Sequence, residues 1–449
     1  MNPFEKMYQE KLVRPEEAVK VVKSGDWVDY SHSLCAPKLL DRALAARASE
    51  LEDVNVRGFF VGHPMAIYEA NDREGRTVFT FNSWFFTGQD RKRAGKDAFY
   101  APMRFNDLPG LYRRKQDVEE FNVLMIQTGC MDKFGYFNLG PSISNTRALV
   151  ERADYILVEE NPRMPYVTGA FDDLLHISEV DYVVQSNEPL DHIPDIAPNE
   201  VDQKIAENIL PYIHDRACLQ LGVGGMPNAV GTLIAHSDLK DLSIHTELFN
   251  DAMMKMAKAG KITGKFNELH PGKSMFAFAQ GSDELMEFMD RNPTLMAGPV
   301  DYVNSPYTCA KISNFISINN AINGNLFGEI NAESDGIRHI SGTGGQLDFV
   351  LGAYMSPGGM SFVVMSSTFQ DRSGKTHSRI VPVFTEGTKV TDPASVVNYI
   401  ATEYGVFNVK GKSAWQRAEG IIGIAHPDFR DGLIKEAEKL GLWKNSNKR

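Results

Sequence analysis

The sequence predicts two open α/β domains in tandem. Three observations lead to this prediction. A chain of 449 residues is too long for one ordinary core, strand-like and helix-like segments alternate along it, and a proline-rich stretch interrupts the alternation. This stretch is "NEPLDHIPDIAPNE", residues 187–200, with three prolines in fourteen residues. We therefore place an N-terminal domain at residues 1–195 and a C-terminal domain at residues 196–449.

The first half of the chain alternates between periodic apolar segments and short apolar runs. Periodic segments are typical of helices with one buried face, and short runs are typical of buried strands. Helices are expected at residues 16–25, 38–51 and 143–153, and strands at residues 26–33, 55–62, 121–129 and 153–161. This order predicts a parallel sheet covered by helices.

After the proline-rich stretch the same alternation begins again. Helices are expected at residues 200–213, 226–236 and 252–260, and strands at residues 217–224 and 242–247. The chain contains no short repeat and no low-complexity tract. A second α/β domain follows from this pattern.

Composition and charge exclude several classes of protein. The chain is 43% hydrophobic and 23% charged, which is ordinary for a soluble globular protein. Its net charge of −11 argues against a nucleic acid or an anionic membrane as the main partner. No apolar run is long enough to span a bilayer, and the N-terminus lacks the apolar region of a signal peptide. We expect a cytoplasmic protein.

The cysteines give no sign of a metal site or of a disulfide framework. Cys35, Cys130, Cys218 and Cys309 are far apart, and no Cys/His spacing suggests zinc. We expect reduced, mostly buried thiols and no metal.

A carboxylate stands at the end of an apolar strand in "LSIHTELFND", residues 242–251. The four residues "LSIH" suit a buried strand, but they run into Thr246 and Glu247. Ligands of open α/β sheets bind beyond the carboxyl ends of the strands, which is where Glu247 is expected.

Two glycine clusters precede expected helices on either side of this carboxylate. The first is "LGVGGMPNAV", residues 221–230, and the second is "SGTGGQLDFVLGA", residues 341–353. Such turns present backbone N–H groups at a helix N-terminus, where they can hold an anion or an oxyanion. The alternative is a tight connection without a ligand, and neither cluster is a dinucleotide-binding or P-loop motif.

Two further segments carry polar side chains in expected turns. Residues 323–336 suggest a hairpin or bulged turn in which Asn331 presents its amide as a donor, or bonds its own backbone instead. Residues 372–382 predict a turn leading into a strand, with Arg372, Lys375 and Arg379 either solvated or facing a phosphate.

Taken together, these motifs resemble the acetyl-CoA hydrolase/transferase family, and within it the butyryl-CoA:acetate and 4-hydroxybutyrate CoA-transferases. The resemblance rests on "LGVGGMPNAV", "IHTELF", "INAES" and "GTGGQLDF" in that order, with "SRIVP", "YVNSPY" and residues 135–165 in support. It covers nearly the whole chain. Asn228 and Ala252 depart from the family pattern, which bears on substrate choice more than on reaction type. The fold implied is two tandem α/β domains of the CoA-transferase (NagB/RpiA-like) type.

The resemblance implies that Glu247 is a nucleophile that forms an acyl-glutamyl anhydride and then a glutamyl-CoA thioester. The Asn331 side chain with the backbone N–H of Gly344 or Gly345 would form an oxyanion hole, and Gln346 would contact bound CoA or its acyl group. The other residues expected to bind CoA or substrate are Gly222, Gly224, Gly225, Met226, Lys375 and Arg379. A glutamate is ionised at neutral pH and needs no general base, which agrees with this role.

The expected reaction transfers CoA between short-chain carboxylic acids such as acetate, propionate, butyrate and 4-hydroxybutyrate, with butyryl-CoA and acetate as first choice. CoA would be a substrate, with no permanently bound cofactor. The family also suggests a homodimer or a dimer of dimers. By analogy of fold, the loops at residues 31–37 and 104–112 would close over the small carboxylate, and His32 and Tyr136 are candidates for touching the acyl chain.

Three alternatives remain open from sequence alone. An acyl-CoA hydrolase would use the same glutamate, with water attacking the intermediate. A sugar-phosphate isomerase or metabolite sensor would need basic residues beside a phosphate cradle, and neither glycine turn contains Lys or Arg. A catalytically silent subunit would use Glu247 only as a structural carboxylate.

Overall fold

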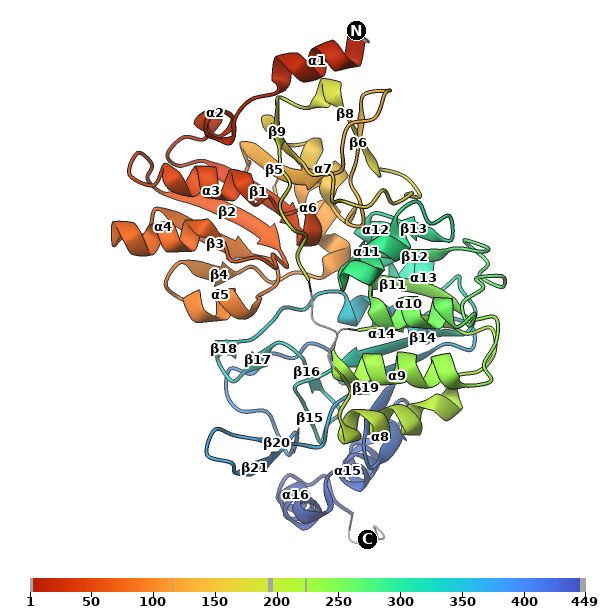
Figure 1. Ribbon diagram of the computed structural model, residues 1–449. Helices are drawn as coiled ribbons and strands as arrows, with labels where there is room; N and C mark the ends of the chain where they lie inside the picture. Colours follow the sequence, from red (N-terminus) through yellow and green to blue (C-terminus); the bar gives the residue numbers. More distant parts are fainter. Residues whose placement is uncertain (1–2, 115, 193–196, 223, 445–449) are drawn as a thin grey trace. The chain divides into compact units, whose positions relative to one another are not determined.

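The computed structural model describes residues 3–114, 116–192, 197–222 and 224–444 (Figure 1). Contacts within the chain divide it into two compact units. Unit 1 comprises Met1–Asp195, Glu247–Asn250 and Met275–Val303, and unit 2 comprises Ile196–Thr246, Asp251–Ser274 and Asn304–Arg449. The expected domain boundary between residues 195 and 196 lies outside the described residues. The division into domains at 1–195 and 196–449 stays a prediction.

Unit 1 is built on a seven-stranded sheet in which all neighbouring strands pair in parallel. The strand order is β4-β3-β2-β1-β5-β7-β9. The strands are β1 (Trp27–His32), β2 (Val54–Phe59), β3 (Phe79–Ser83), β4 (Ala98–Tyr100), β5 (Val123–Thr128), β7 (Tyr155–Glu160) and β9 (Tyr182–Gln185). Because β5 and β7 are buried along nearly their whole length, helices must cover both faces of the sheet.

The helices of unit 1 follow the strands along the chain, as the alternating pattern predicts. They are α1 (Pro3–Lys11), α2 (Pro15–Ala18), α3 (Leu39–Ala46), α4 (Ala66–Glu74), α5 (Gly88–Arg93), α6 (Leu108–Arg113) and α7 (Thr146–Val150). A small antiparallel pair, β6 (Tyr136–Asn138) with β8 (Leu174–His176), also belongs here. The expected helix at residues 16–25 is shorter than predicted, because α2 passes into a 3₁₀ turn at Val19–Val21.

Later segments of the chain complete unit 1. Residues 275–303 supply most of β12 (Ser274–Ala279), together with α11 (Asp283–Met289), β13 (Leu295–Ala297) and α12 (Val300–Val303). Phe278 on β12 packs edge-on against Phe59 of β2 at a ring distance of 6.0 Å. Unit 1 is therefore discontinuous in sequence.

Unit 2 contains the strand order β11-β10-β14-β19-β23-β24. Its strands are β10 (Cys218–Leu221), the first four residues of β11 (Ser243–Phe249), β14 (Phe315–Asn320), β19 (Met360–Val364), β23 (Tyr399–Thr402) and β24 (Gly405–Asn408). The last three residues of β11, from Glu247 on, are grouped with unit 1. All of these neighbours pair in parallel except the last, β23 with β24. The strand order reverses at β10, which lies between β11 and β14, and ligands of such sheets bind at this kind of reversal.

Helices and small hairpins surround the unit 2 strands. The helices are α8 (Glu200–Ile209), α9 (Gly225–His236), α10 (Asp251–Lys258), α13 (Pro306–Cys309), α14 (Gln346–Met355), α15 (Ala414–Gly423) and α16 (Pro427–Lys439). Helices α8, α9 and α10 pack in a row, with α9 in the middle (Figure 1). The small strands are β15 (Asn323–Asn325), β16 (Ile330–Asn331), β17 (Ser334–Asp335), β18 (Arg338–His339), β20 (Thr368–Gln370), β21 (Thr376–Ser378) and β22 (Ile380–Val381).

The parallel sheets with interleaved helices confirm the predicted fold class of tandem α/β domains. The hairpin expected within residues 323–336 is confirmed by the antiparallel pairing of β15 with β16. Among the described residues, no helix is long and apolar enough to cross a membrane.

Candidate active site

Glu247 is the one partly exposed residue of an otherwise buried strand. The other six residues of β11 are buried, and the strand ends two residues after the carboxylate, at Phe249. Helix α10 starts soon afterwards, at Asp251. Burial on both sides holds the Glu247 backbone in place while its side chain keeps access to solvent.

The first glycine turn joins β10 to α9 beside the reversal of strand order. Gly222 donates its backbone N–H to the carbonyl oxygen of Ile318 at 2.8 Å. Gly224 is the N-cap residue of α9 with φ of +123°, a conformation that side chains rarely adopt, and a Cβ there would lie 3.0 Å from Nδ2 of Asn320. No side chain caps the helix, so Gly225 begins it with N–H groups left for solvent or a ligand.

A cavity of about 340 Å³ lies beside this turn within unit 2. Three of the residues predicted to bind CoA or substrate, Gly225, Met226 and Arg379, line it together. The rest of the lining is Asp202, Ile205, Asn320, Ala321, Ile322, Val364, Met365 and Ser366. The cavity therefore joins the N-terminus of α9 with the carboxyl ends of β14 and β19, and Arg379 is the cation among its lining residues.

Arg379 is held rigidly in the cavity wall. Its Nη1 donates to the carbonyl oxygen of Ile322 at 2.8 Å, and its Nε donates to Oγ of Ser366 at 3.1 Å. Burial lowers the pKa of Arg379, and the negative charge of Glu403 opposes this shift. An arginine remains protonated in spite of such a shift, so Arg379 places a positive charge in a lining that also contains the carboxyl group of Asp202.

Asn331 on β16 is fully buried, and its side chain is engaged within the protein. Its Nδ2 donates to Oδ1 of Asn323 at 2.8 Å and to the carbonyl oxygen of Ser334 at 2.7 Å. Its Oδ1 accepts from the backbone N–H groups of Glu333 and Ser334, both at 3.0 Å. These contacts are the ones that a turn asparagine makes with its own loop.

The second glycine turn leads into α14. Gly344 has φ of +53°, and Gly345 is the N-cap residue of α14, again without a side-chain cap. Gln346 begins the helix and donates from Nε2 to Oδ2 of Asp392 at 2.6 Å. Both glycine turns thus present an uncapped helix N-terminus, as the sequence predicts.

The backbone of Ile322 hydrogen-bonds both to Asn331, the predicted oxyanion donor, and to Arg379, a predicted CoA contact. Its N–H donates to the carbonyl oxygen of Asn331 at 2.8 Å, while its own carbonyl oxygen accepts from Arg379. Lys375 does not join Asn331 and Arg379. It is exposed in the turn between β20 and β21, where its backbone N–H donates to Oδ1 of Asp371.

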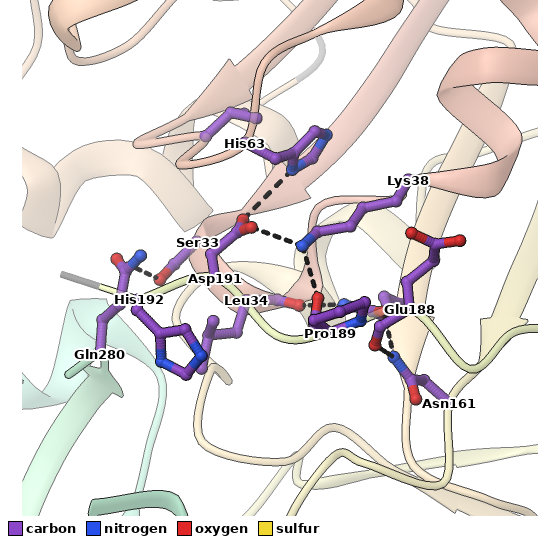
Figure 2. A network of polar contacts seen from close by, with 12 residues as sticks. Ser33, Leu34, Lys38, His63, Asn161, Glu188, Pro189, Asp191, His192 and Gln280 are labelled. Atoms are coloured by element: carbon purple, nitrogen blue, oxygen red, sulfur yellow. Dashed lines mark hydrogen bonds and ion pairs between the residues drawn. The ribbon is translucent and has the colours of Figure 1, made fainter. Parts of the chain in front are cut away.

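In unit 1, Lys38 comes directly after the loop at residues 31–37 and belongs to a buried network of polar side chains (Figure 2). Nζ of Lys38 lies 2.5 Å from Oδ1 of Asp191, and Nδ1 of His63 lies 3.2 Å from the other oxygen. Oγ of Ser33 contacts Oε1 of Gln280 at 3.3 Å. These contacts fix residues 189–192 against unit 1, just before the end of the described segment.

The two candidates for contact with the acyl chain both have packing partners in unit 1. His32 is fully buried, and burial lowers its pKa to about 3, so it is neutral at physiological pH. The ring of Tyr136 packs on the ring of His176 at 4.7 Å. Contact of either residue with the acyl chain stays a prediction.

Sequence analysis missed Asp392, Thr391 and Ile322, which tie the predicted residues together. Asp392 precedes a proline, which in sequence signals only a turn. Ile322 acts through its backbone, so its side chain gives no signal. A group of three or more His, Cys, Asp or Glu residues placed to hold a metal ion is not found in the described part of the chain.

Comparison with known proteins identifies the family of this chain. The model of the acetyl-CoA hydrolase/transferase N-terminal domain matches residues 2–194, and that of the C-terminal domain of the same family matches residues 281–437. A butyryl-CoA:acetate CoA-transferase from Anaerostipes caccae is 49% identical over 450 residues, covering 99% of this chain and 100% of that protein.

Two further comparisons extend over the whole chain. A "probable butyrate:acetyl-CoA coenzyme A-transferase" from Syntrophomonas wolfei is 47% identical over 442 residues, 98% of each chain. The crystal structure of RipA from Yersinia pestis, 34% identical, matches with a TM-score of 0.89 over 98% of this chain and 99% of RipA. This chain belongs to the acetyl-CoA hydrolase/transferase family.

Proposed function

We propose that this chain is a short-chain acyl-CoA:carboxylate CoA-transferase, with butyryl-CoA and acetate as its first pair of substrates. The observation that carries the proposal is that two relatives, 49% and 47% identical over nearly the full chain, are named for CoA transfer between butyrate and acetate. These names favour transfer over hydrolysis by the same nucleophile. They give no support to a sugar-phosphate isomerase.

The reaction proceeds through two covalent states of Glu247. Its carboxylate attacks the thioester carbonyl of the acyl-CoA and expels CoA thiolate, which leaves an acyl-glutamyl anhydride. The thiolate then attacks the glutamyl carbonyl, giving a glutamyl-CoA thioester and releasing the first carboxylate. The incoming carboxylate attacks this thioester, and the thiolate returns to the new acyl group, which restores Glu247.

The position of Glu247 suits a nucleophilic carboxylate. Buried residues flank it on the strand and limit its contact with water, which returns some reactivity to a weak nucleophile. Its partial exposure leaves room for the acyl-CoA to approach. No general base is needed, because a glutamate is already ionised at neutral pH.

Each attack creates an oxyanion, and the proposed donors come from the second glycine turn. One such donor contributes about 3 kcal/mol to transition-state stability. Both amide hydrogens of Asn331 are donated within its loop. For Asn331 to serve as a donor, one of these bonds must be exchanged for the oxyanion. The backbone N–H groups of Gly344 and Gly345 are the other proposed donors.

The cavity beside α9 is the proposed place for part of CoA. A helix N-terminus and a partly buried guanidinium both favour a negatively charged group, and CoA carries phosphates. Arg379 is therefore proposed as a phosphate contact, with Gly222, Gly224, Gly225 and Met226 shaping the wall. Lys375, on its exposed hairpin, is proposed only as a peripheral contact.

The proposal also includes a cytoplasmic location and assembly as a homodimer or a dimer of dimers. Both rest on the family resemblance. Light scattering after size-exclusion chromatography measures the assembly directly.

Intact mass spectrometry tests the covalent mechanism. Wild-type protein incubated with butyryl-CoA and no acceptor is expected to gain the mass of CoA minus water, and acetate is expected to remove the adduct as acetyl-CoA appears. Glu247→Ala should form no adduct. Glu329→Gln is the matched control, because Glu329 is a partly buried carboxylate of unit 2 that lies outside the candidate site.

The other possible outcomes each support a different function. An adduct that decays equally fast without acetate makes the protein a hydrolase. The absence of both adduct and exchange with every short acyl-CoA contradicts the covalent mechanism and leaves Glu247 as a structural carboxylate.

A further inference from the structure

Asp392 is a buried carboxyl group to which the mechanism above gives no role. Its side chain is fully buried in unit 2. Its Oδ2 accepts the hydrogen bond from Nε2 of Gln346, and Oδ1 has no hydrogen-bond partner among the residues that the structure describes. A buried carboxylate with a single hydrogen bond is costly to keep ionised. Its presence beside a residue expected to contact CoA calls for an explanation.

The bond to Asp392 fixes which end of the Gln346 amide points away from Asp392. An ionised carboxylate has no hydrogen and can only accept, so the NH₂ end of the amide must face Asp392. Oε1 of Gln346 then faces away, and the half-buried side chain presents it as a hydrogen-bond acceptor. The last torsion of glutamine is soft, so without this carboxylate either end can turn outward.

The backbone around Asp392 holds the same carboxylate against β16. Asp392 donates its N–H to the carbonyl oxygen of Ile330 at 3.2 Å and accepts from the N–H of Ile330 at 3.1 Å. The hydroxyl of Thr391 accepts from the N–H of Ala332 and donates to Oε1 of Glu333, both at 2.9 Å. The carboxylate is therefore fixed relative to the strand that carries Asn331, and it fixes Gln346 in turn.

Asp392 changes its protonation state near neutral pH. Burial raises its pKa to about 7, the hydrogen bond from Gln346 opposes the shift, and the charge of Glu333 adds to it. Glu333 faces it from the turn after β16, and α14 presents the neutral amide of Gln346. From α15, Arg417 donates to the carbonyl oxygen of Ala394. A protonated Asp392 can donate a hydrogen bond. Oε1 of Gln346 can accept this bond only if the amide turns over.

We propose that Asp392 is a positioning residue. Its ionised form turns Oε1 of Gln346 toward CoA, where it accepts a hydrogen bond from an amide N–H of the pantetheine arm, and its protonated form turns the amide over. The inference rests on the proposed function, because Gln346 is expected to contact bound CoA. It adds the chemical group that Gln346 recognises and the residue that controls this recognition.

The test measures KM and kcat for butyryl-CoA between pH 6 and pH 8 in the wild type, Asp392→Asn and Asp392→Ala. A single group with a pKa near 7 raises the wild-type KM about tenfold between pH 8 and pH 6. Asp392→Asn cannot titrate, so its KM should stay flat to within about twofold. Asp392→Ala should raise KM at pH 8 about tenfold while kcat changes less, the pattern of a lost binding contact.

Glu329→Gln is the matched control for these variants. Oε2 of Glu329 accepts from Nδ2 of Asn325 at 2.6 Å, the same kind of bond at the same length as that between Gln346 and Asp392. This variant should keep the wild-type profile. Titration of the CoA phosphates is common to all four proteins and cancels in the comparison.

The outcomes separate this inference from the proposed function. If Asp392→Asn keeps the wild-type dependence of KM on pH, the inference is wrong, whether or not Asp392→Ala folds. If the wild type transfers no CoA, the proposed function fails, and calorimetric titration with free CoA then decides. The inference is supported if the Kd for CoA is about tenfold weaker at pH 6 than at pH 8 in the wild type but not in Asp392→Asn. It is contradicted if the two proteins give the same Kd at each pH.

Discussion

Lys38, Asp191 and His63 form a nearly buried cluster of ionisable side chains in unit 1. Lys38, Asp191 and His63 keep only 11%, 10% and 7% of their side-chain surface exposed. Burial by itself would raise the pKa of Asp191, but the hydrogen bonds and charges of His63 and Lys38 outweigh it and lower the pKa. Breaking such a pair leaves the remaining charge buried without compensation.

We expect Asp191→Asn to lower the free energy of unfolding by about 3 kcal/mol at pH 7. Because the pKa of Asp191 is lower in the folded state, its stabilisation is present above the unfolded pKa of about 4 and is lost as pH falls through the folded value. Urea unfolding at pH 7 and at pH 3 measures the two free energies, and the difference between the two proteins should be smaller at the lower pH.

Glu188→Gln is the control for this substitution. Glu188 also pairs with a basic side chain, Arg42, at 2.7 Å, but that pair is largely exposed. Its loss should change the free energy of unfolding by less than about 1 kcal/mol. A cost for Asp191→Asn no larger than that of the control would show that the buried network does not hold residues 189–192.

At the scale of the element, the N-terminus of α9 depends on Gly224. We expect Gly224→Ala to cost about 1–3 kcal/mol in stability, because its φ of +123° is unfavourable for alanine. The new methyl group would also lie against Nδ2 of Asn320 in the cavity wall. CoA transfer should fall more than stability alone explains, as kcat/KM measured well below the melting temperature would show.

Gly260→Ala separates backbone strain from effects on the cavity. Gly260 has φ of +72° after α10, and an added Cβ there would meet no atom within 4 Å. We expect it to cost stability and leave kcat/KM unchanged. An equal loss of activity in both variants would mean that the first glycine turn does not shape the substrate site.

The elements also show which parts of the site are readable from sequence. A glycine cluster followed by an apolar segment is a local signal, so a helix follows each cluster as predicted, and α9 begins one residue before the expected start. The contact of Gln346 with Asp392 joins residues 46 positions apart, and no local pattern encodes it. That Asn331 bonds its own turn was one of two possibilities in the sequence, but its partners Asn323 and Ser334 could not be predicted, because they are ordinary turn residues in sequence.

At the scale of the whole molecule, the alternation of strands and helices predicted the fold class but not the path of the chain. Such alternation is read from neighbouring residues, whereas the membership of a segment in a unit depends on distant contacts. Residues 275–303 follow many residues of unit 2 in sequence and yet are grouped with unit 1. Their role could not be inferred from the pattern that placed a second domain after residue 195.

The discontinuity of unit 1 makes a prediction about fragments. Residues 275–303 contribute backbone hydrogen bonds to the earlier part of unit 1: Ala277 accepts from Ile143, Ala279 donates to Pro141, and Ala170 donates to Ala297. A fragment of residues 1–195 lacks all of these partners. Its buried residues Phe59 and Phe105, which pack against Phe278, would lose that cover as well.

We therefore expect the fragment of residues 1–195 to unfold without the cooperative transition of the full chain and to bind a hydrophobic dye. Burial of apolar surface drives folding, so a core that lacks β12 and its neighbours has less to gain from it. Circular dichroism during heating and dye fluorescence measure the two properties, with the full chain as control. A sharp transition with native near-ultraviolet signal would show instead that residues 1–195 form an independent domain, and that residues 275–303 only pack on a finished core.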